Sequence, residues 1–299
     1  MIRLRFRGGN MKRKYFDLYK IFIYVALISL AISIIIPVSW VFLASIKTNA
    51  EFYGNPWALP QGFNIQNFID AFQIAQVGDF ILNSALVTAM ALAILLVVSL
   101  PAAYVLARFQ FKGRKFFNTL IMAGLFINVN YIVVPIFLML NGWDKSLAKS
   151  GLQFFMNNRF VLALVYASTA IPFTVYLLAS YFRSLPKAYE EAAEIDGCGY
   201  FTTMVRVMFR MAKPSIITVI LFNFLAFWNE YIISLTLVQT KALKTLPVGL
   251  QNLMSAQKAA TNYGPMYAGL VIVMLPTLIL YILVQRRLTQ GMTLGGLKD

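Results

Sequence analysis

The chain of 299 residues contains no histidine, a single cysteine and few charged side chains. The absence of histidine excludes histidine acid–base chemistry, serine–histidine triads and histidine metal ligands. One cysteine, Cys198, excludes an internal disulfide and any multi-cysteine metal site built by this chain alone. Charged residues make up 12% of the chain, about half the share found in a soluble domain, whereas hydrophobic residues make up 60%. The composition therefore indicates a protein embedded in a membrane.

Six apolar runs are long enough to cross a bilayer, which requires roughly 17 to 25 residues. Five of them contain no ionisable side chain, and the sixth contains only Glu230. Because hydrocarbon leaves every backbone polar group to be satisfied within its own segment, each run is predicted to be a helix. The runs are Ile21–Ile46, Phe80–Ala107, Phe116–Leu140, Phe160–Phe182, Ser215–Thr240 and Tyr263–Gln285. The prediction is an all-α polytopic membrane protein with six transmembrane helices.

The basic residues are distributed unevenly between the connecting segments. Nineteen of the 26 Lys and Arg residues lie in the N-terminal segment, the second loop, the fourth loop and the C-terminal segment. The positive-inside rule places these four segments, and both termini, in the cytoplasm. The net charge of +15 is then an orientation signal, with a contribution from anionic membrane lipids, and gives no support to nucleic-acid binding. The predicted organisation is a basic N-terminus (1–20), a six-helix domain (21–286) that includes the fourth loop (183–214), and a C-terminal tail (287–299).

The fourth loop has a helical pattern interrupted by glycine. Leu185-Pro186 ends the preceding span, and Ala188–Ile195 is rich in the helix formers Ala and Glu. After Gly197 and Gly199, a second amphipathic piece runs towards Pro214, which suits the first turn of the next helix. The pattern predicts two short helices around a glycine bend, lying against the membrane face. Periodicity alone fits either a surface for another protein or a solvated connector.

Glu191-Ala192-Ala193, followed after three residues by Gly197, resembles the EAA loop of bacterial ABC importer permeases. Asp196 also matches the version of this loop found in sugar importers. The resemblance implies that the fourth loop is a coupling helix, seated in a cleft of a cytoplasmic ATPase subunit. The positions carried over to this docking are Glu191, Ala192, Ala193, Asp196, Gly197 and Pro214.

The resemblance extends from about Lys14 to the end of the chain, with one departure. It includes the Asn83-Ser84 pair, FLAFWNEYIISLTLV, TLPVGLQ and the final segment YGPMYAGLVIVMLPTLILYILVQRRLTQGMTLGGLKD. These segments resemble the second, six-span permease subunit of maltose-type carbohydrate importers. Phe209 and Arg210 stand where the family has Leu-Pro, which leaves the last turn of the loop undefined.

This resemblance implies a type I ABC importer permease that moves a sugar or oligosaccharide across the bacterial cytoplasmic membrane. The implied partners are a second permease subunit, an ATPase dimer, an extracytoplasmic sugar-binding protein and membrane lipids. ATP and Mg would be bound by the ATPase, and the tail after Arg287 would reach into the ATPase dimer. Since this chain has no GxxxxGKS/T phosphate loop, we expect no cofactor or metal on it and no enzymatic activity. A self-contained secondary transporter driven by an ion gradient is the alternative.

An ionisable side chain within a span is costly and is by default a functional hypothesis. Helical spacing places Glu230 on one face with Asn223, Phe227 and Ser234. Sugars offer hydroxyls to amides and carboxylates, and C–H faces to aromatic rings, so this face is a candidate substrate path. The residues that flank it are Trp228, Asn229 and Tyr231, and Asn128 and Asn130 form another polar pair in the third run. The alternative is hydrogen bonding between helices, with Glu230 paired to a partner permease.

Overall fold

The computed structural model describes residues 9–75, 77–148, 151, 153–259 and 262–296, and no strand occurs in these ranges. In chain order the elements are α1 (Gly9–Ser45), α2 (Asn49–Gly54), α3 (Gln66–Ala75), α4 (Val77–Arg108), α5 (Arg114–Gly124), α6 (Val129–Ala148), α7 (Arg159–Ser184), α8 (Ala188–Ile195), α9 (Tyr200–Thr202), the π-helix η1 (Thr203–Met208), α10 (Phe209–Met211), α11 (Lys213–Trp228), α12 (Ile232–Leu237), the 3-10 helix η2 (Lys241–Leu243), α13 (Leu246–Ala259) and α14 (Tyr263–Gly296). The all-helical class expected from the sequence is confirmed.

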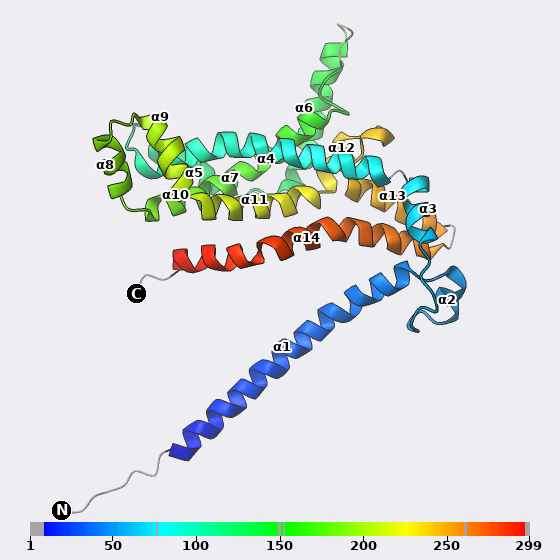
Figure 1. The fold of residues 1–299 in the computed structure, drawn as a ribbon. Coiled ribbons are helices and arrows are strands. Elements are labelled where there is room, and N and C mark those ends of the chain that lie inside the picture. Colours follow the sequence, from blue (N-terminus) through cyan, green and yellow to red (C-terminus); the bar gives the residue numbers. More distant parts are fainter. Residues whose placement is uncertain (1–8, 76, 149–150, 152, 260–261, 297–299) are drawn as a thin grey trace, which may run out of the picture.

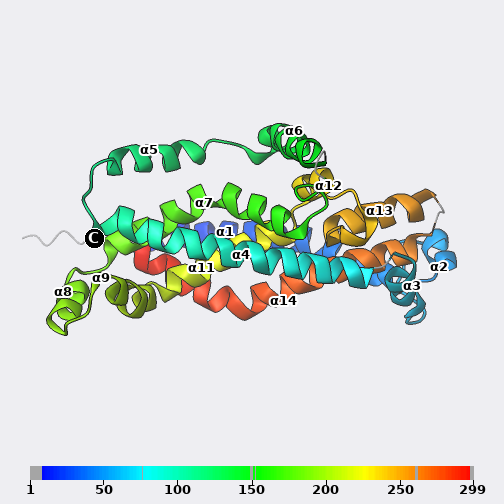
Figure 2. The same ribbon diagram turned by 90° about the horizontal axis from the view of Figure 1, so that it is seen from above.

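Four long helices, α4, α7, α11 and α14, run side by side and form the body of the molecule (Figures 1 and 2). Their facing sides are apolar and bury three hydrophobic clusters along the bundle. One cluster contains Phe182 and Met208 near α8, a second surrounds Tyr166 at mid-length, and a third contains Phe80 and Trp228 near α3 and α13. Because lipid gives little hydrophobic drive between helices, this close packing holds the bundle together.

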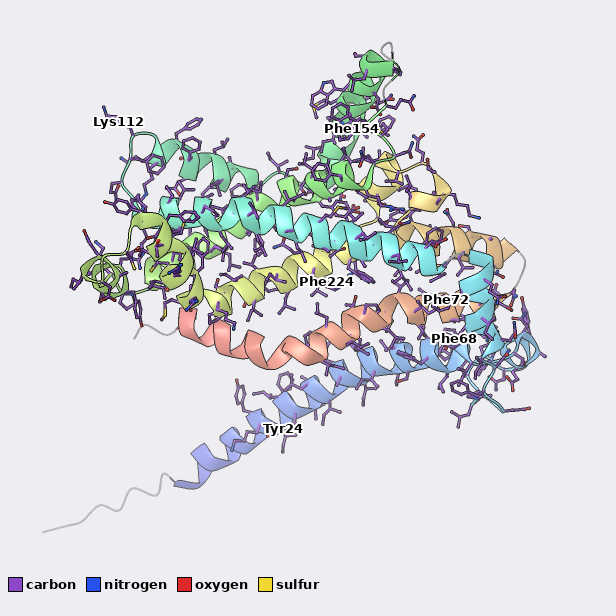
Figure 3. The ribbon with its side chains drawn as sticks, turned by 45° about the horizontal axis from the view of Figure 1, so that its top comes forward. Tyr24, Phe68, Phe72, Lys112, Phe154 and Phe224 are labelled. Carbon is purple, nitrogen blue, oxygen red and sulfur yellow. The ribbon has the colours of Figure 1, made fainter. Side chains whose placement is uncertain are left out.

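Helix α1 diverges from the bundle along most of its length (Figure 1). Its C-terminal end packs against α14, where the rings of Trp40 and Tyr267 lie 5.2 Å apart. Tyr24, on the diverging stretch, is exposed (Figure 3). The apolar surface of α1 is therefore left for lipid or another chain to cover.

Four of the six predicted spans are single long helices, namely α1, α4, α7 and α14, and each is long and apolar enough to cross a membrane. The other two predicted spans overlap bent pairs of helices, which are α5 with α6 and the stretch Tyr200–Met211 with α11, and the number of spans is six when each pair is counted as one. Each of these two predicted spans, Phe116–Leu140 and Ser215–Thr240, is interrupted by a turn that a side chain stabilises.

The prediction of one continuous helix over Phe116–Leu140 is wrong. α5 and α6 meet at 103°, so α6 projects from the bundle (Figure 1). The Asn128 side chain accepts a hydrogen bond from the Asn130 backbone N–H (3.0 Å) and caps the start of α6. A Cβ on Gly124 would lie 2.7 Å from the Pro172 ring, so glycine allows α5 to approach α7 at the turn.

The prediction of one helix over Ser215–Thr240 is also wrong. α11 ends at Trp228, and α12 starts a new helix at Ile232. The Asn229 amide donates to the carbonyl of Leu225 (2.8 Å) at the end of α11. The Glu230 carboxylate accepts the backbone N–H of Ile233 (2.8 Å) and begins α12. These two polar side chains supply hydrogen bonds where the helix is interrupted, which an apolar membrane segment requires.

The two ends of the bundle differ in what they carry. The fourth loop, with α8 and α9, lies at one end, and α2, α3 and α13 lie at the other (Figure 1). The first described turn of α1 and the last described turn of α14 both lie toward the α8 side (Figure 1). The N-terminal residues 1–8 and C-terminal residues 297–299 fall outside the described ranges.

Candidate functional site

The fourth loop folds as the sequence predicts, with α8 followed by a bend and a second helical stretch over Tyr200–Met211. The bend is a Schellman cap, in which the N–H of Gly197 donates to the carbonyl of Glu194 (2.9 Å) and the N–H of Cys198 donates to Ala193 (2.9 Å). Gly197 has φ +76°, which disfavours residues with a Cβ. The glycine of the EAA pattern is therefore required by the backbone.

The outer surface of the fourth loop combines acidic and apolar side chains. Glu191, Ala192, Asp196 and Gly197 are all exposed. Beside them, Ile195 is 87% exposed, and two aromatic rings follow in the next helical stretch: Tyr200 at 81% and Phe201 at 74%. Exposed apolar groups beside charges are typical of a surface that binds another protein.

Two predicted docking residues face away from that surface. Ala193 is only 4% exposed, so its side chain faces the interior of the protein. Pro214 is half-buried in the first turn of α11, as the sequence predicts. Both positions shape the loop from within.

The departure at Phe209 and Arg210 is accommodated within a helix. The Phe209 ring packs on Phe182, with centroids 6.1 Å apart, and Arg210 is exposed. The helical stretch runs through Phe209 and Arg210 to Met211, and the chain then bends by 74° into α11. The direction change therefore occurs after the position at which Leu-Pro is expected.

A second site is a cavity of about 370 Å³ between α6, α7, α11 and α12. We call it the polar cavity, because amide, hydroxyl and carboxylate groups face it. Its polar lining residues are Asn128, Asn130, Tyr166, Thr169, Asn223 and Glu230, and its apolar ones are Val129, Ala170, Ala226, Phe227 and Ile233. The two turns that correct the predicted spans both border this cavity, so the helix interruptions create it.

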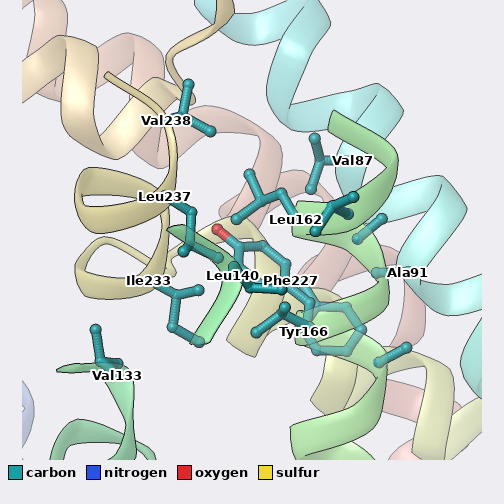
Figure 4. Close-up of a cluster of buried hydrophobic side chains, with 14 of the residues drawn as sticks. Val87, Ala91, Val133, Leu140, Leu162, Tyr166, Phe227, Ile233, Leu237 and Val238 are labelled. Carbon is teal, nitrogen blue, oxygen red and sulfur yellow. The ribbon is translucent and has the colours of Figure 1, made fainter. Parts of the chain in front are cut away.

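Glu230 is the centre of the polar cavity's hydrogen bonding. Its carboxylate accepts the Tyr166 hydroxyl (2.9 Å) and the backbone N–H groups of Ile233 (2.8 Å) and Ser234 (3.0 Å). The Tyr166 ring stacks on Phe227, with centroids 5.6 Å apart (Figure 4). An acid at membrane depth is thus stabilised by donors from its own chain, as such a group requires.

Only three of the seven predicted substrate-path residues line the polar cavity: Asn223, Phe227 and Glu230. The interrupted helix removes the regular spacing beyond Phe227. Asn223 is buried, and its amide donates to Thr174 on α7 (3.1 Å) and to the carbonyl of Val219 (2.9 Å). It therefore joins α11 to α7, as the alternative of inter-helix hydrogen bonding anticipates.

The other four predicted residues lie elsewhere. Trp228 is buried and stacks on Phe224, 5.5 Å away. Asn229 is exposed at the end of α11, and Tyr231 is half-buried. The Ser234 hydroxyl is buried 2.7 Å from the hydroxyl of Thr245. These side chains therefore take part in packing or in helix ends away from the polar cavity.

Tyr166 and Thr169 face the polar cavity, and sequence reasoning did not select them. The available signal is the polar cluster Tyr166-Ala167-Ser168-Thr169 within an otherwise apolar run, three residues before Pro172. Within the described residues, no group of three His, Cys, Asp or Glu residues is arranged to hold a metal ion. The polar cavity can therefore offer hydrogen bonds, one carboxylate and an aromatic edge to a solute.

The fold and its two sites define a class: a polytopic membrane permease with a polar cavity between its helices and a helical loop exposed at one end. Residues 99–293 match the family described as "Binding-protein-dependent transport system inner membrane component", and the chain belongs to this family. It is therefore a membrane-spanning permease subunit of an ABC transport system.

Individual relatives agree with this assignment. The chain is 34% identical to the "Diacetylchitobiose uptake system permease protein NgcG" of Streptomyces coelicolor, over 90% of this chain and 86% of the relative. It is 30% identical to the "Sulfoquinovosyl glycerol transport system permease protein SmoH" of Agrobacterium fabrum, over 92% and 93%. A chain in the crystal structure of a bacterial ABC transporter involved in the import of the acidic polysaccharide alginate shares the fold, with a TM-score of 0.76, 22% identity and coverage of 95% and 99%.

Proposed function

We propose that this permease carries a sugar or short oligosaccharide inward across the bacterial cytoplasmic membrane, driven by ATP hydrolysis on a separate subunit. NgcG is named for uptake of diacetylchitobiose, and SmoH for transport of sulfoquinovosyl glycerol. The polar cavity is the observation that carries the assignment of substrate class to this chain.

The chemistry of the polar cavity suits a polyhydroxylated solute. A carboxylate offers about four acceptor positions, and three of those on Glu230 are occupied by donors of this chain. One position is left for a sugar hydroxyl. Asn128 and Asn130, at the start of α6, are exposed, line the same cavity and offer both donors and acceptors. Phe227 contributes an aromatic edge to the lining, since one face of its ring stacks on Tyr166.

The fourth loop is the proposed contact with the ATPase. Glu191, Ala192, Asp196 and Gly197 form its exposed surface, and Ile195 adds an apolar group that a cleft would bury. In this proposal the α8 end of the bundle faces the cytoplasm, together with both termini. ATP and Mg bind to the ATPase dimer, and this chain transmits motion without catalysing a reaction.

A complete importer needs two further partners in this proposal. A second permease subunit packs beside this chain in the membrane and contributes the other half of the pathway. An extracytoplasmic sugar-binding protein delivers the solute to the end that carries α2, α3 and α13. Closure of the ATPase dimer moves the fourth loop, and the permease pair changes from inward-facing to outward-facing.

The experiment is to purify the affinity-tagged chain from native membranes with its bound subunits and reconstitute the complex into proteoliposomes. We expect an ATPase subunit to co-purify. With the cognate binding protein outside the vesicles, we expect uptake of a radiolabelled disaccharide to require ATP inside them, because only complexes whose ATPase faces the lumen import into it. The variant Glu191→Lys reverses one exposed charge on the fourth loop and is expected to lose the ATPase subunit. Uptake by the chain alone, abolished by an uncoupler and independent of ATP, would instead identify an ion-driven secondary transporter.

A further inference from the structure

Glu190 lies next to the exposed docking residues, yet its side chain points into the permease. Its carboxylate accepts a hydrogen bond from the Tyr104 hydroxyl (2.8 Å) and lies 3.5 Å from Nε of Arg108. The Arg108 side chain is 8% exposed and that of Glu190 is 23% exposed. Tyr104 and Arg108 belong to the last turn of α4, so an ion pair shielded from solvent connects α8 to a helix distant in sequence.

Arg108 makes a second connection at the same place. Its guanidinium donates to the carbonyl of Leu185 (2.6 Å), the residue that follows the last turn of α7. Arg108 therefore holds together the end of α4, the end of α7 and the first half of the fourth loop. A planar guanidinium suits this task, because its donors are fixed in a rigid fork.

The second half of the fourth loop reaches the same point on α4. The ring of Tyr200 packs edge-on against Phe109, with centroids 6.0 Å apart, and Phe109 packs in the same way on Tyr104 at 5.6 Å. A cavity of about 350 Å³ lies between these groups, with Cys198 among its lining residues. Both halves of the loop thus contact the end of α4. The neighbouring cavity leaves room for the side chains at these contacts to rearrange.

We propose that Tyr104, Arg108 and Glu190 form a latch through which movement of the fourth loop is transmitted to α4. The inference rests on the proposed function, because it requires an ATPase to move the loop. Covalent connection links the loop only to α7 and α11, whereas α4 ends at Arg108, before α5 begins. Motion of the loop therefore reaches α4 through non-covalent contacts, and the latch is the polar and directional part of them.

Through the latch, movement of the ATPase is transmitted along α4 to the packing beside the polar cavity. α4 supplies Val87 and Ala91 to the hydrophobic cluster that surrounds Tyr166 and Phe227 (Figure 4). Packed interiors transmit displacement because they contain few voids. A pull on the end of α4 consequently displaces the packing beside the wall of the polar cavity that carries Glu230. Tyr104, Arg108 and Glu190 are positioning residues in this account, since none of them touches the substrate.

The test uses the reconstituted complex and the variants Arg108→Gln, Glu190→Gln and Tyr104→Phe. The readout is sugar uptake per ATP hydrolysed, together with retention of the ATPase subunit. We expect Arg108→Gln and Glu190→Gln to keep the ATPase bound and active while uptake per ATP falls on the order of tenfold. Tyr104→Phe removes one hydrogen bond and leaves the ion pair, so its loss is smaller. Arg108→Lys keeps the charge and is expected to retain more coupling than Arg108→Gln.

Lys115→Gln is the matched control, because Lys115 is an exposed cation in the first turn of α5, outside the fourth loop and the latch; its uptake per ATP stays at the wild-type value. A purely structural anchor would lower ATPase activity and uptake together, and the ratio would not change. The inference is wrong if the ratio stays within about twofold of wild type in Arg108→Gln and Glu190→Gln. Loss of the ATPase in Glu191→Lys with an unchanged ratio in the latch variants would overturn the latch alone. An ATPase that stays bound in Glu191→Lys would instead contradict the docking role of the loop.

Discussion

The fourth loop exposes its docking carboxylates to solvent, whereas the polar cavity holds its polar groups in hydrogen bonds within the chain. In the loop, Glu191 and Asp196 are exposed and face away from the protein. In the cavity, the carboxylate of Glu230 is held by three donors of its own chain, and the amide of Asn223 by two acceptors. The membrane interior contains no water to hydrogen-bond polar groups, so the protein itself must satisfy them. The charges of a loop outside the membrane can stay solvated until a partner binds.

Both regions also depend on a break in a helix, with different causes. The loop turns through Gly197, whose backbone adopts a positive φ. The cavity forms where α11 stops and the Glu230 side chain starts α12. The positive φ of Gly197 affects only the nearby backbone. The Glu230 side chain both starts α12 and bonds to Tyr166 on α7, so substitutions in the two regions should have different effects.

The largest effect is expected from breaking the cavity at Glu230→Ala. The change leaves the hydroxyl of Tyr166 and the backbone N–H groups of Ile233 and Ser234 without their acceptor. We expect a loss of roughly 2–4 kcal/mol in stability and loss of uptake, seen as a lower thermal unfolding midpoint in detergent. Glu230→Gln retains an acceptor oxygen and is expected to lose less. A midpoint for Glu230→Ala equal to that of wild type would contradict the capping role.

An intermediate effect is expected from Gly197→Ala in the loop. No atom lies within 4 Å of the added Cβ, so the cost comes only from the left-handed backbone, at about 1–2 kcal/mol. That corresponds to about tenfold weaker binding of the ATPase, measured by co-purification titration, with little change in the unfolding midpoint of the bundle. Gly199→Ala is the matched control, because Gly199 has φ −72° and open space around it. Equal losses in the two variants would show that strain is not the cause.

The smallest effect is expected from Asn223→Ala, which removes the hydrogen bond between α11 and α7. Such bonds within membranes contribute about 0.5–1 kcal/mol, so the unfolding midpoint should fall slightly. Thr174→Val removes the same bond from the other side. The double variant should lose no more than the larger single change, and full additivity would show that the two side chains act independently.

The sequence predicts the loop well and the cavity only in part. Gly197 and Pro214 predict a bend and a helix start, because each acts on the backbone nearest to it. Glu230 also stands out in sequence, but its partner Tyr166 lies 64 positions away. The distance along the chain conceals this pairing, and the same is true of Tyr104 and Glu190, 86 positions apart.

The sequence by itself determined that this is a helical membrane protein and that its fourth loop is a glycine-capped helical pair. Those properties depend on apolar run length and on residues close together in the chain. Only the tertiary structure decided where two apolar runs are interrupted, which polar groups share a cavity, and which distant helix the fourth loop contacts. Run length measures compatibility with hydrocarbon, but it does not record where a side chain takes over the backbone's hydrogen bonds or which distant helix supplies its partner.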